Sequence, residues 1–155
     1  MRDRDVRAAI ADVLSATGAF DIGGVWLWSP EDLGRGTSVG RGCQIEPGNS
    51  TVTDPWDAQT AGGLVIMSQV QITLLYRDED AQKRDEGAEN LLQQCQNALN
   101  GQSLVGLTLP ALTRFQSWSW VRAQPPERQI ICTFQYSYIV EGWDNFDTTE
   151  EEGER

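Results

Sequence analysis

The stretch that most constrains this fold is residues 129–142, QIICTFQYSYIVEG. Large apolar residues recur at every second position, as in a β-strand, where successive side chains point to opposite faces. This apolar set comprises Ile130, Cys132, Phe134, Tyr136, Tyr138 and Val140. The residues between them include the uncharged polar Thr133, Gln135 and Ser137. We therefore predict a strand with one face against a core and one small-polar face left open.

Residues 64–77, LVIMSQVQITLLYR, repeat this two-faced pattern. The apolar side consists of Val70, Ile72, Leu74 and Tyr76, and the polar side of Gln69, Gln71 and Thr73. A sheet that contains both strands would bury one face and present an uncharged polar face on the other.

Two segments carry apolar residues at helical spacing, residues 3–16 and 78–101. The first stripe is Val6, Ile10, Val13 and Leu14, and the second is Ala88, Leu91, Leu92, Cys95, Ala98 and Leu99. Asn100-Gly101 is a typical helix end. Each helix therefore has one stripe to bury, and a sheet face is the available partner.

The tryptophans are unusually numerous, six in 155 residues, and four of them form two pairs. Trp26 and Trp28 lie on an expected strand at 25–28, and Trp118 and Trp120 on another at 112–123. Such pairs fit either core packing or an interface, where Trp and Arg are enriched. The isolated Trp56 is a further interface candidate, together with the polar-face residues Gln69, Gln71, Thr73 and Gln135.

Residues 29–63 are rich in Gly, Pro, Ser, Thr and Asp, and we predict a long flexible loop, with a short strand possible near Gln44–Glu46. The chain is expected to form one domain over 1–142, followed by an acidic tail at 143–155. The predicted order of elements is helix, strand, loop, strand, helix, strand, strand. This order predicts an α+β fold, with two helices on one face of a mostly antiparallel sheet.

Catalytic and cofactor chemistry is not indicated. The chain has no histidine, its glycine-rich segment GRGTSVGRG at 34–42 lacks the spacing of a nucleotide-binding loop, and its three cysteines have no zinc-site spacing. No apolar run reaches the length of a membrane span, and the N-terminus does not resemble a signal peptide. We expect no enzyme, no cofactor, no metal and no membrane contact.

The formal net charge is −11, which argues against a nucleic-acid binder, because phosphate binding requires clustered Lys and Arg. It is compatible with DNA that slides past without adhering, since an acidic wall repels phosphate. Glu141, Asp144 and Asp147 begin an acidic stretch at the C-terminal end of the chain.

The layout resembles the tail terminator family of long-tailed bacteriophages, the minor tail protein U type, also called tail completion or neck proteins. The resemblance covers roughly residues 3–140. It includes the helix ending NALNG, the following QSLVGLTLPALTRFQSWSWV and the final strand CTFQYSYIV. It implies a structural virion protein that forms a hexameric ring on the tail tube, stops tube polymerisation and joins the tail to the head connector or stopper protein. DNA would pass through the lumen, and the resemblance implies that the acidic stretch with Glu141, Asp144 and Asp147 faces this lumen or a neighbouring subunit.

Two alternatives remain at this stage. One is another head-tail connector component, such as a stopper or head-completion protein, or a tail-tube protein. The other is a soluble module that binds a protein or small ligand through its aromatic pairs and long loop.

Overall fold

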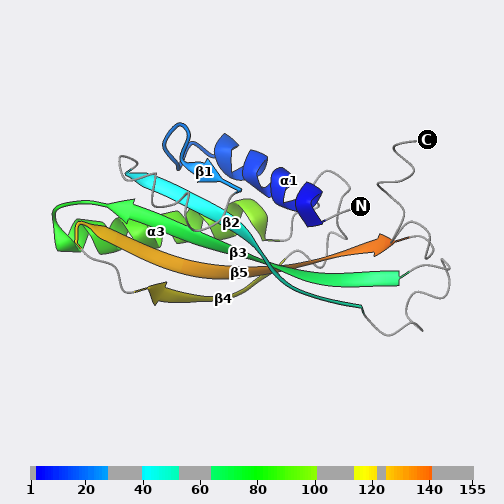
Figure 1. Ribbon diagram of the computed structural model, residues 1–155. Coiled ribbons are helices and arrows are strands. Elements are labelled where there is room, and N and C mark those ends of the chain that lie inside the picture. Colours follow the sequence, from blue (N-terminus) through cyan, green and yellow to red (C-terminus); the bar gives the residue numbers. More distant parts are fainter. Residues whose placement is uncertain (1–2, 28–39, 53–63, 101–113, 122–124, 141–155) are drawn as a thin grey trace.

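The computed structural model describes residues 3–27, 40–52, 64–100, 114–121 and 125–140. Its elements are α1 (Asp3–Ala16), β1 (Val25–Trp26), β2 (Arg41–Val52), β3 (Leu64–Arg77), α3 (Ala81–Leu99), β4 (Arg114–Val121) and β5 (Glu127–Val140) (Figure 1). The predicted α+β fold is confirmed.

The five strands form one twisted sheet in the order β1-β2-β3-β5-β4. Every neighbouring pair is antiparallel except β1 and β2, which run parallel. At its centre, β3 and β5 pair over their full length, from Leu64 opposite Val140 to Arg77 opposite Glu127. The two segments with the clearest alternation are therefore direct neighbours.

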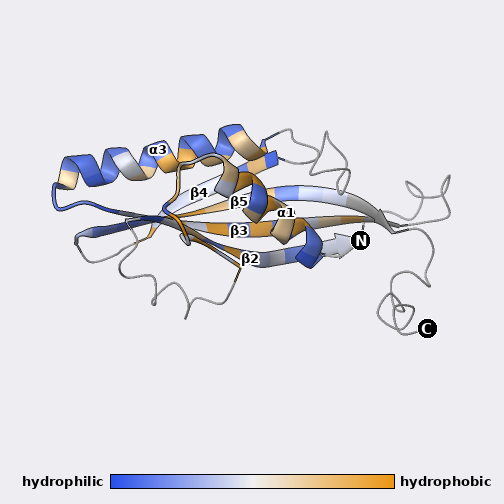
Figure 2. Ribbon diagram, turned by 90° about the horizontal axis from the view of Figure 1, so that it is seen from above, coloured by the Kyte–Doolittle hydropathy of each residue, from blue (hydrophilic) through white to orange (hydrophobic). Residues whose placement is uncertain are grey.

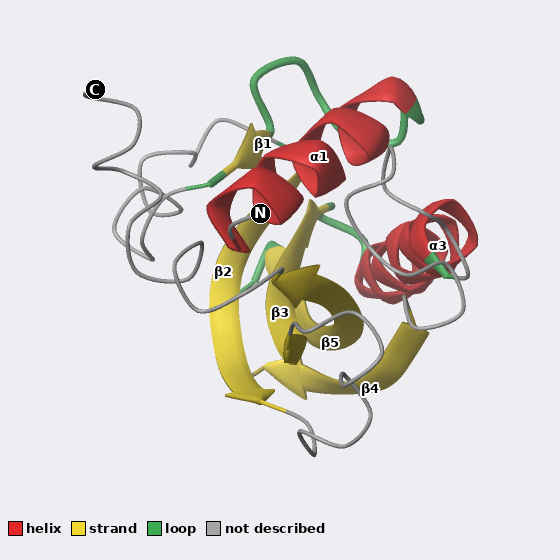
Figure 3. Cartoon of the chain, turned by 90° about the vertical axis from the view of Figure 1, so that its right-hand side faces the viewer, coloured by secondary structure: helices red, strands yellow, loops and turns green. Residues whose placement is uncertain are grey.

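Both helices lie on the same side of the twisted sheet (Figure 3). The stripe of α1 buries Val6, Ile10 and Leu14, and α3 buries Ala88, Leu91, Leu92, Cys95 and Leu99. These side chains form one cluster with Cys43, Ile45, Val70, Ile72, Leu74, Ile130, Cys132, Phe134 and Tyr136. Apolar residues follow the middle of β3 and β5 in Figure 2. Each large aliphatic or aromatic side chain buried here contributes about 1.5–3 kcal/mol.

Polar contacts fix the helix ends to the sheet. The Asp80 carboxylate caps α3 by accepting from the backbone amides of Gln82 and Lys83. In the first turn of α1, Asp3 accepts from the Tyr136 hydroxyl at 2.7 Å and from the Ser50 hydroxyl at 3.3 Å. Asp3 thereby ties α1 to both β5 and β2.

The prediction of a long loop over 29–63 is wrong for residues 41–52, which form the 12-residue strand β2. The short strand expected near residues 44–46 lies within it. Cys43 and Ile45 alternate as buried apolar residues there, and Pro47 and Gly48 come directly after Glu46. The register with β3 shifts between Pro47 and Ser50, and proline is tolerated in a sheet at such irregularities. Two apolar residues beside a proline gave too weak a pattern for a long strand.

Candidate interface surfaces

The face of the sheet opposite the helices, here called the open face, carries the predicted polar residues. Gln69 pairs with Gln135, and Gln71 pairs with Thr133. Gln71 is exposed, and Gln69, Thr73, Thr133 and Gln135 are partly exposed. The β3 and β5 polar sets therefore form adjacent rows on one accessible surface.

Three glutamines connect three strands on this face. The Gln69 amide Nε2 donates to Gln116 Oε1 at 3.0 Å, and the Gln116 amide donates to Gln135 Oε1. Gln116 occupies the irregularity in β4 between Phe115 and Ser117. Alternation alone did not identify Gln116, because the extra residue of a bulge breaks the period of two.

A shallow hollow of about 250 Å³ lies beside this network on the open face. It is lined by Asn49, Thr51, Met67, Gln69 and Gln135. Neutral amides, a hydroxyl and a thioether give it hydrogen-bonding capacity without charge, so it suits a neighbouring polar surface better than an ionic ligand.

The open face is not open along its whole length. Ser137, predicted to be on its accessible polar set, is fully buried, as are Gln44 and Leu75. Alternation reports which side of the strand a residue faces, but not what covers it. Leu75 pairs with Gly42, and the ring of Trp26 lies within 3.0 Å of where a Gly42 Cβ would be. This end of the face is therefore closely packed around Trp26, which is half-buried.

The open face is nearly free of charge. At one end, the Arg77 guanidinium and the Glu127 carboxylate form an ion pair at 2.9 Å. The only other charged side chains on the described part of this face are Glu46 on β2 and Arg114 on β4, next to its opposite margins. The centre is uncharged, as the sequence pattern predicts.

The second tryptophan pair lies on the helix side of the sheet, not on the open face. Trp118 and Trp120 are opposite the buried Cys132 and Ile130 of β5. Their rings meet edge to face, with centroids 6.0 Å apart. Trp120 packs against the core, whereas Trp118 is 45% exposed. One ring thus serves the core and the other remains available for contact.

Arg128 packs against this aromatic pair. The Arg128 guanidinium lies 4.4 Å from the Trp120 ring centroid, and its Nε lies 3.3 Å from Asp85 Oδ1 of α3. Cation–π contact and ion pairing together hold Arg128 between α3 and β4. Neither Arg128 nor Asp85 was singled out from the sequence, because they are 43 positions apart and share no motif.

The other predicted site residues, Trp28, Trp56, Glu141, Asp144 and Asp147, lie outside the described residues. The expectation that Trp26 and Trp28 share one side of a strand therefore stays a prediction. The same holds for the acidic tail and for an acidic passage.

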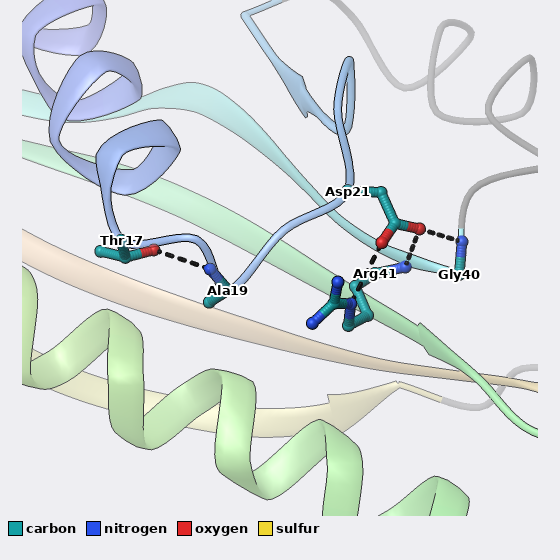
Figure 4. A network of polar contacts seen from close by, with 5 residues as sticks. All are labelled: Thr17, Ala19, Asp21, Gly40 and Arg41. Atoms are coloured by element: carbon teal, nitrogen blue, oxygen red, sulfur yellow. Dashed lines mark hydrogen bonds and ion pairs between the residues drawn. The ribbon is translucent and has the colours of Figure 1, made fainter.

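The turn between α1 and β1 exposes an apolar side chain that the sequence did not single out. The Asp21 carboxylate accepts from the backbone amides of Gly40 and Arg41, and its Oδ1 lies 3.1 Å from Arg41 Nε (Figure 4). The Gly24 amide donates to the Asp21 carbonyl at 2.8 Å, and Gly23 has a φ of 73°. This turn holds Ile22 fully exposed.

The pKa of Asp21 reflects this network. Partial desolvation raises the pKa, but the amides of Arg41 and Gly40 and the Arg41 guanidinium outweigh it, so the pKa lies below the ordinary value of 3.8. Because the folded-state pKa is lowered, this stabilisation is present above the unfolded-state pKa and is lost as pH falls through the folded-state value.

We expect Asp21→Asn to lower the melting temperature at pH 7 and to make stability less dependent on pH below about pH 4. Thermal melts from pH 7 to pH 2 measure both effects, with Asp12→Asn on the exposed side of α1 as the control. An Asp21→Asn protein whose stability falls with acid as steeply as the wild type would contradict this assignment.

The three cysteines are buried small side chains, as predicted for Cys95 and Cys132. The Cys132 thiol donates to the Ile72 carbonyl at 3.3 Å. Burial, with the neighbouring Cys132, raises the pKa of Cys43. A hydrogen bond with Cys132, together with burial, raises the pKa of Cys95. The described residues contain no group of three or more His, Cys, Asp or Glu arranged to hold a metal ion.

We expect all three thiols to resist alkylation in the native protein. At pH 8, iodoacetamide should label them at least about 100-fold more slowly than in guanidinium chloride, because reaction requires both exposure and a thiolate. Mass spectrometry of the labelled protein gives the rates. A cysteine modified as fast as free cysteine would show that the core is open there.

Neither α1 nor α3 combines the length and apolarity needed to cross a lipid bilayer.

Comparison with known proteins finds similar solved structures but no matching family. No protein-family model matches the chain, and no curated protein matches it. A chain from the virion of a native gene transfer agent particle is similar, with 17% sequence identity and a TM-score of 0.47. The similarity covers 86% of this chain and 94% of that one.

Proposed function

We propose that this protein is a structural component of a phage-type virion, a tail terminator that forms a hexameric ring on the end of the tail tube. In that role it ends tube polymerisation, presents a surface for the head-tail connector or stopper protein and lets DNA pass through the lumen. The sequence resemblance supplies the class of protein, and the one-sided sheet is the structural feature that supports it.

The observation that carries the proposal is the uncharged centre of the open face, formed by β3 and β5. Two helices cover one face of the sheet, and the centre of the other face carries side-chain amides and hydroxyls and no charged group. Such a surface can contact a neighbouring subunit or wet a channel through hydrogen bonds, and it lacks the clustered cations that retain DNA.

Tube-length measurement tests the role directly. A tail-tube protein is polymerised with and without this chain, and tube lengths and ends are measured by negative-stain microscopy. We expect substoichiometric amounts to shorten the tubes and to leave a distinct cap at one end. Tubes of unchanged length with bare ends would overturn the assignment.

The aromatic cluster of Trp118, Trp120 and Arg128 also suits a binding module of another class, since Trp and Arg are enriched at binding hot spots. In that case Trp118→Ala should abolish capture of one protein partner without any effect on tube length. If Trp118 serves a terminator, the same substitution should alter tube capping.

A further inference from the structure

We propose that subunits join edge to edge, with β4 of one copy pairing with the uncovered part of β2 of the next. This inference rests on the proposed ring and names the surfaces that build it. The occupant of each edge is therefore a second copy of this chain.

Both sheet margins present unpaired backbone within the described residues. Among the described strands β4 pairs only with β5, with its Phe115 amide donating to Asn100 Oδ1 at 3.0 Å, and β1 covers β2 only at Cys43 and Gln44. Side chains along β4 and from Pro47 to Thr51 are largely exposed. Strand edges without a neighbour can pair with another chain. β4 contains neither proline nor lysine, whereas the β2 edge contains Pro47, so pairing there would use the backbone groups on either side of Pro47.

The strand directions suit a closed ring. Three successive antiparallel pairings, β2 with β3, β3 with β5 and β5 with β4, make β4 antiparallel to β2. Rotation about an axis along the strands preserves their direction, so β4 would meet β2 of the next copy in antiparallel orientation. The two edges differ, so the contact is head-to-tail, as cyclic rings require.

Charge complementarity supports this pairing. Glu46 lies on the β2 margin and Arg114 on the β4 margin, both on the open face, and neither forms an ion pair with another described residue. Across the sheet, Glu46 is in one row of paired residues with Gln71, Thr133 and Ser117. Arg114 is opposite Gln135, which belongs to the next row on the same face. If the two edges join in this register, Glu46 of one copy and Arg114 of the next become diagonal cross-strand neighbours. Such neighbours lie about 7–8 Å apart, within reach of long side chains.

The exposed Trp118 fits the same contact from the other side of the sheet. Its ring projects from the edge strand on the helix side and is fixed against Trp120, which Arg128 covers. A strand added to β4 would cover Trp118 and bury apolar area at the centre of the contact, where aromatic hot spots concentrate.

Charge reversal tests the edge contact. Arg114→Glu, Glu46→Arg and the double variant are each incubated with tail tubes, and rings are quantified by sedimentation with the tubes and by negative-stain microscopy. Lys83→Glu and Glu89→Arg on exposed positions of α3 match the changes in net charge. Circular dichroism melts confirm that every variant is folded.

We expect each single reversal to reduce ring formation at least about tenfold, and the double variant to recover most of it. Rings formed equally well by all variants would overturn the edge contact and leave the ring intact. If each single variant loses ring formation and the double variant does not recover it, the pairing of Glu46 with Arg114 is overturned too. If the wild-type protein forms no rings on tubes, the proposed function fails, and this contact fails with it.

Discussion

Replacing Phe134 by alanine is expected to lower the free energy of unfolding by about 3–5 kcal/mol, the largest effect among our predictions. Phe134 is buried in the centre of β5, opposite Val70 of β3. Its ring meets Phe115 of β4 edge to face, with centroids 5.3 Å apart. Truncation would leave a cavity beneath the helices and loosen β4. Urea unfolding followed by circular dichroism measures the loss.

The control substitution is made at a residue on the other face of the same sheet. Gln71 is exposed on the open face of β3, and Gln71→Ala should change stability by no more than about 0.5 kcal/mol. Phe134→Leu should cost less than about half of the alanine effect, because most of the buried volume is kept. Similar losses for Phe134→Ala and Gln71→Ala would refute the one-sided sheet.

Gly87→Ala is expected to destabilise the protein, although alanine is the better helix former. In an exposed helix interior, this change would stabilise by about 1 kcal/mol. Here a Cβ on Gly87 would lie 2.2 Å from Tyr76 Cζ and 2.3 Å from Cε1. Tyr76 packs against the core, so either its ring or α3 must shift. We expect a net loss of about 1–2 kcal/mol.

A double-mutant cycle isolates the cause. In a Tyr76→Ala background the obstructing ring is gone, and Gly87→Ala should then become neutral or stabilising. Chemical denaturation of the four proteins gives the coupling energy. A Gly87→Ala protein more stable than the wild type would show that α3 does not approach β3 this closely.

The sequence predicts the central layers of this fold well, because their patterns are strictly periodic. β3 and β5 each place apolar residues at every second position, and the stripes of α1 and α3 have helical spacing. Which face is buried follows from these patterns alone. The order of the strands across the sheet does not follow from the sequence, since alternation carries no information about which strands are neighbours.

Irregular positions account for what sequence reasoning missed. β2 was largely hidden because Pro47 and Gly48 resemble a loop, although a strand can accommodate them at a bulge. Gln116 joins the open-face glutamines because β4 contains an extra residue. The positions of Glu46 and Arg114 at opposite margins depend on the strand order, and so could not be foreseen.

End-on imaging of capped tail tubes tests the central claim most directly. Tubes are assembled with this protein, and averaged negative-stain views down the tube axis give the number of copies at the end and the state of the lumen. We predict six copies in a closed annulus with a clear central channel. Single copies attached to the tube wall, or a cap that fills the lumen, would contradict a ring built from these sheets.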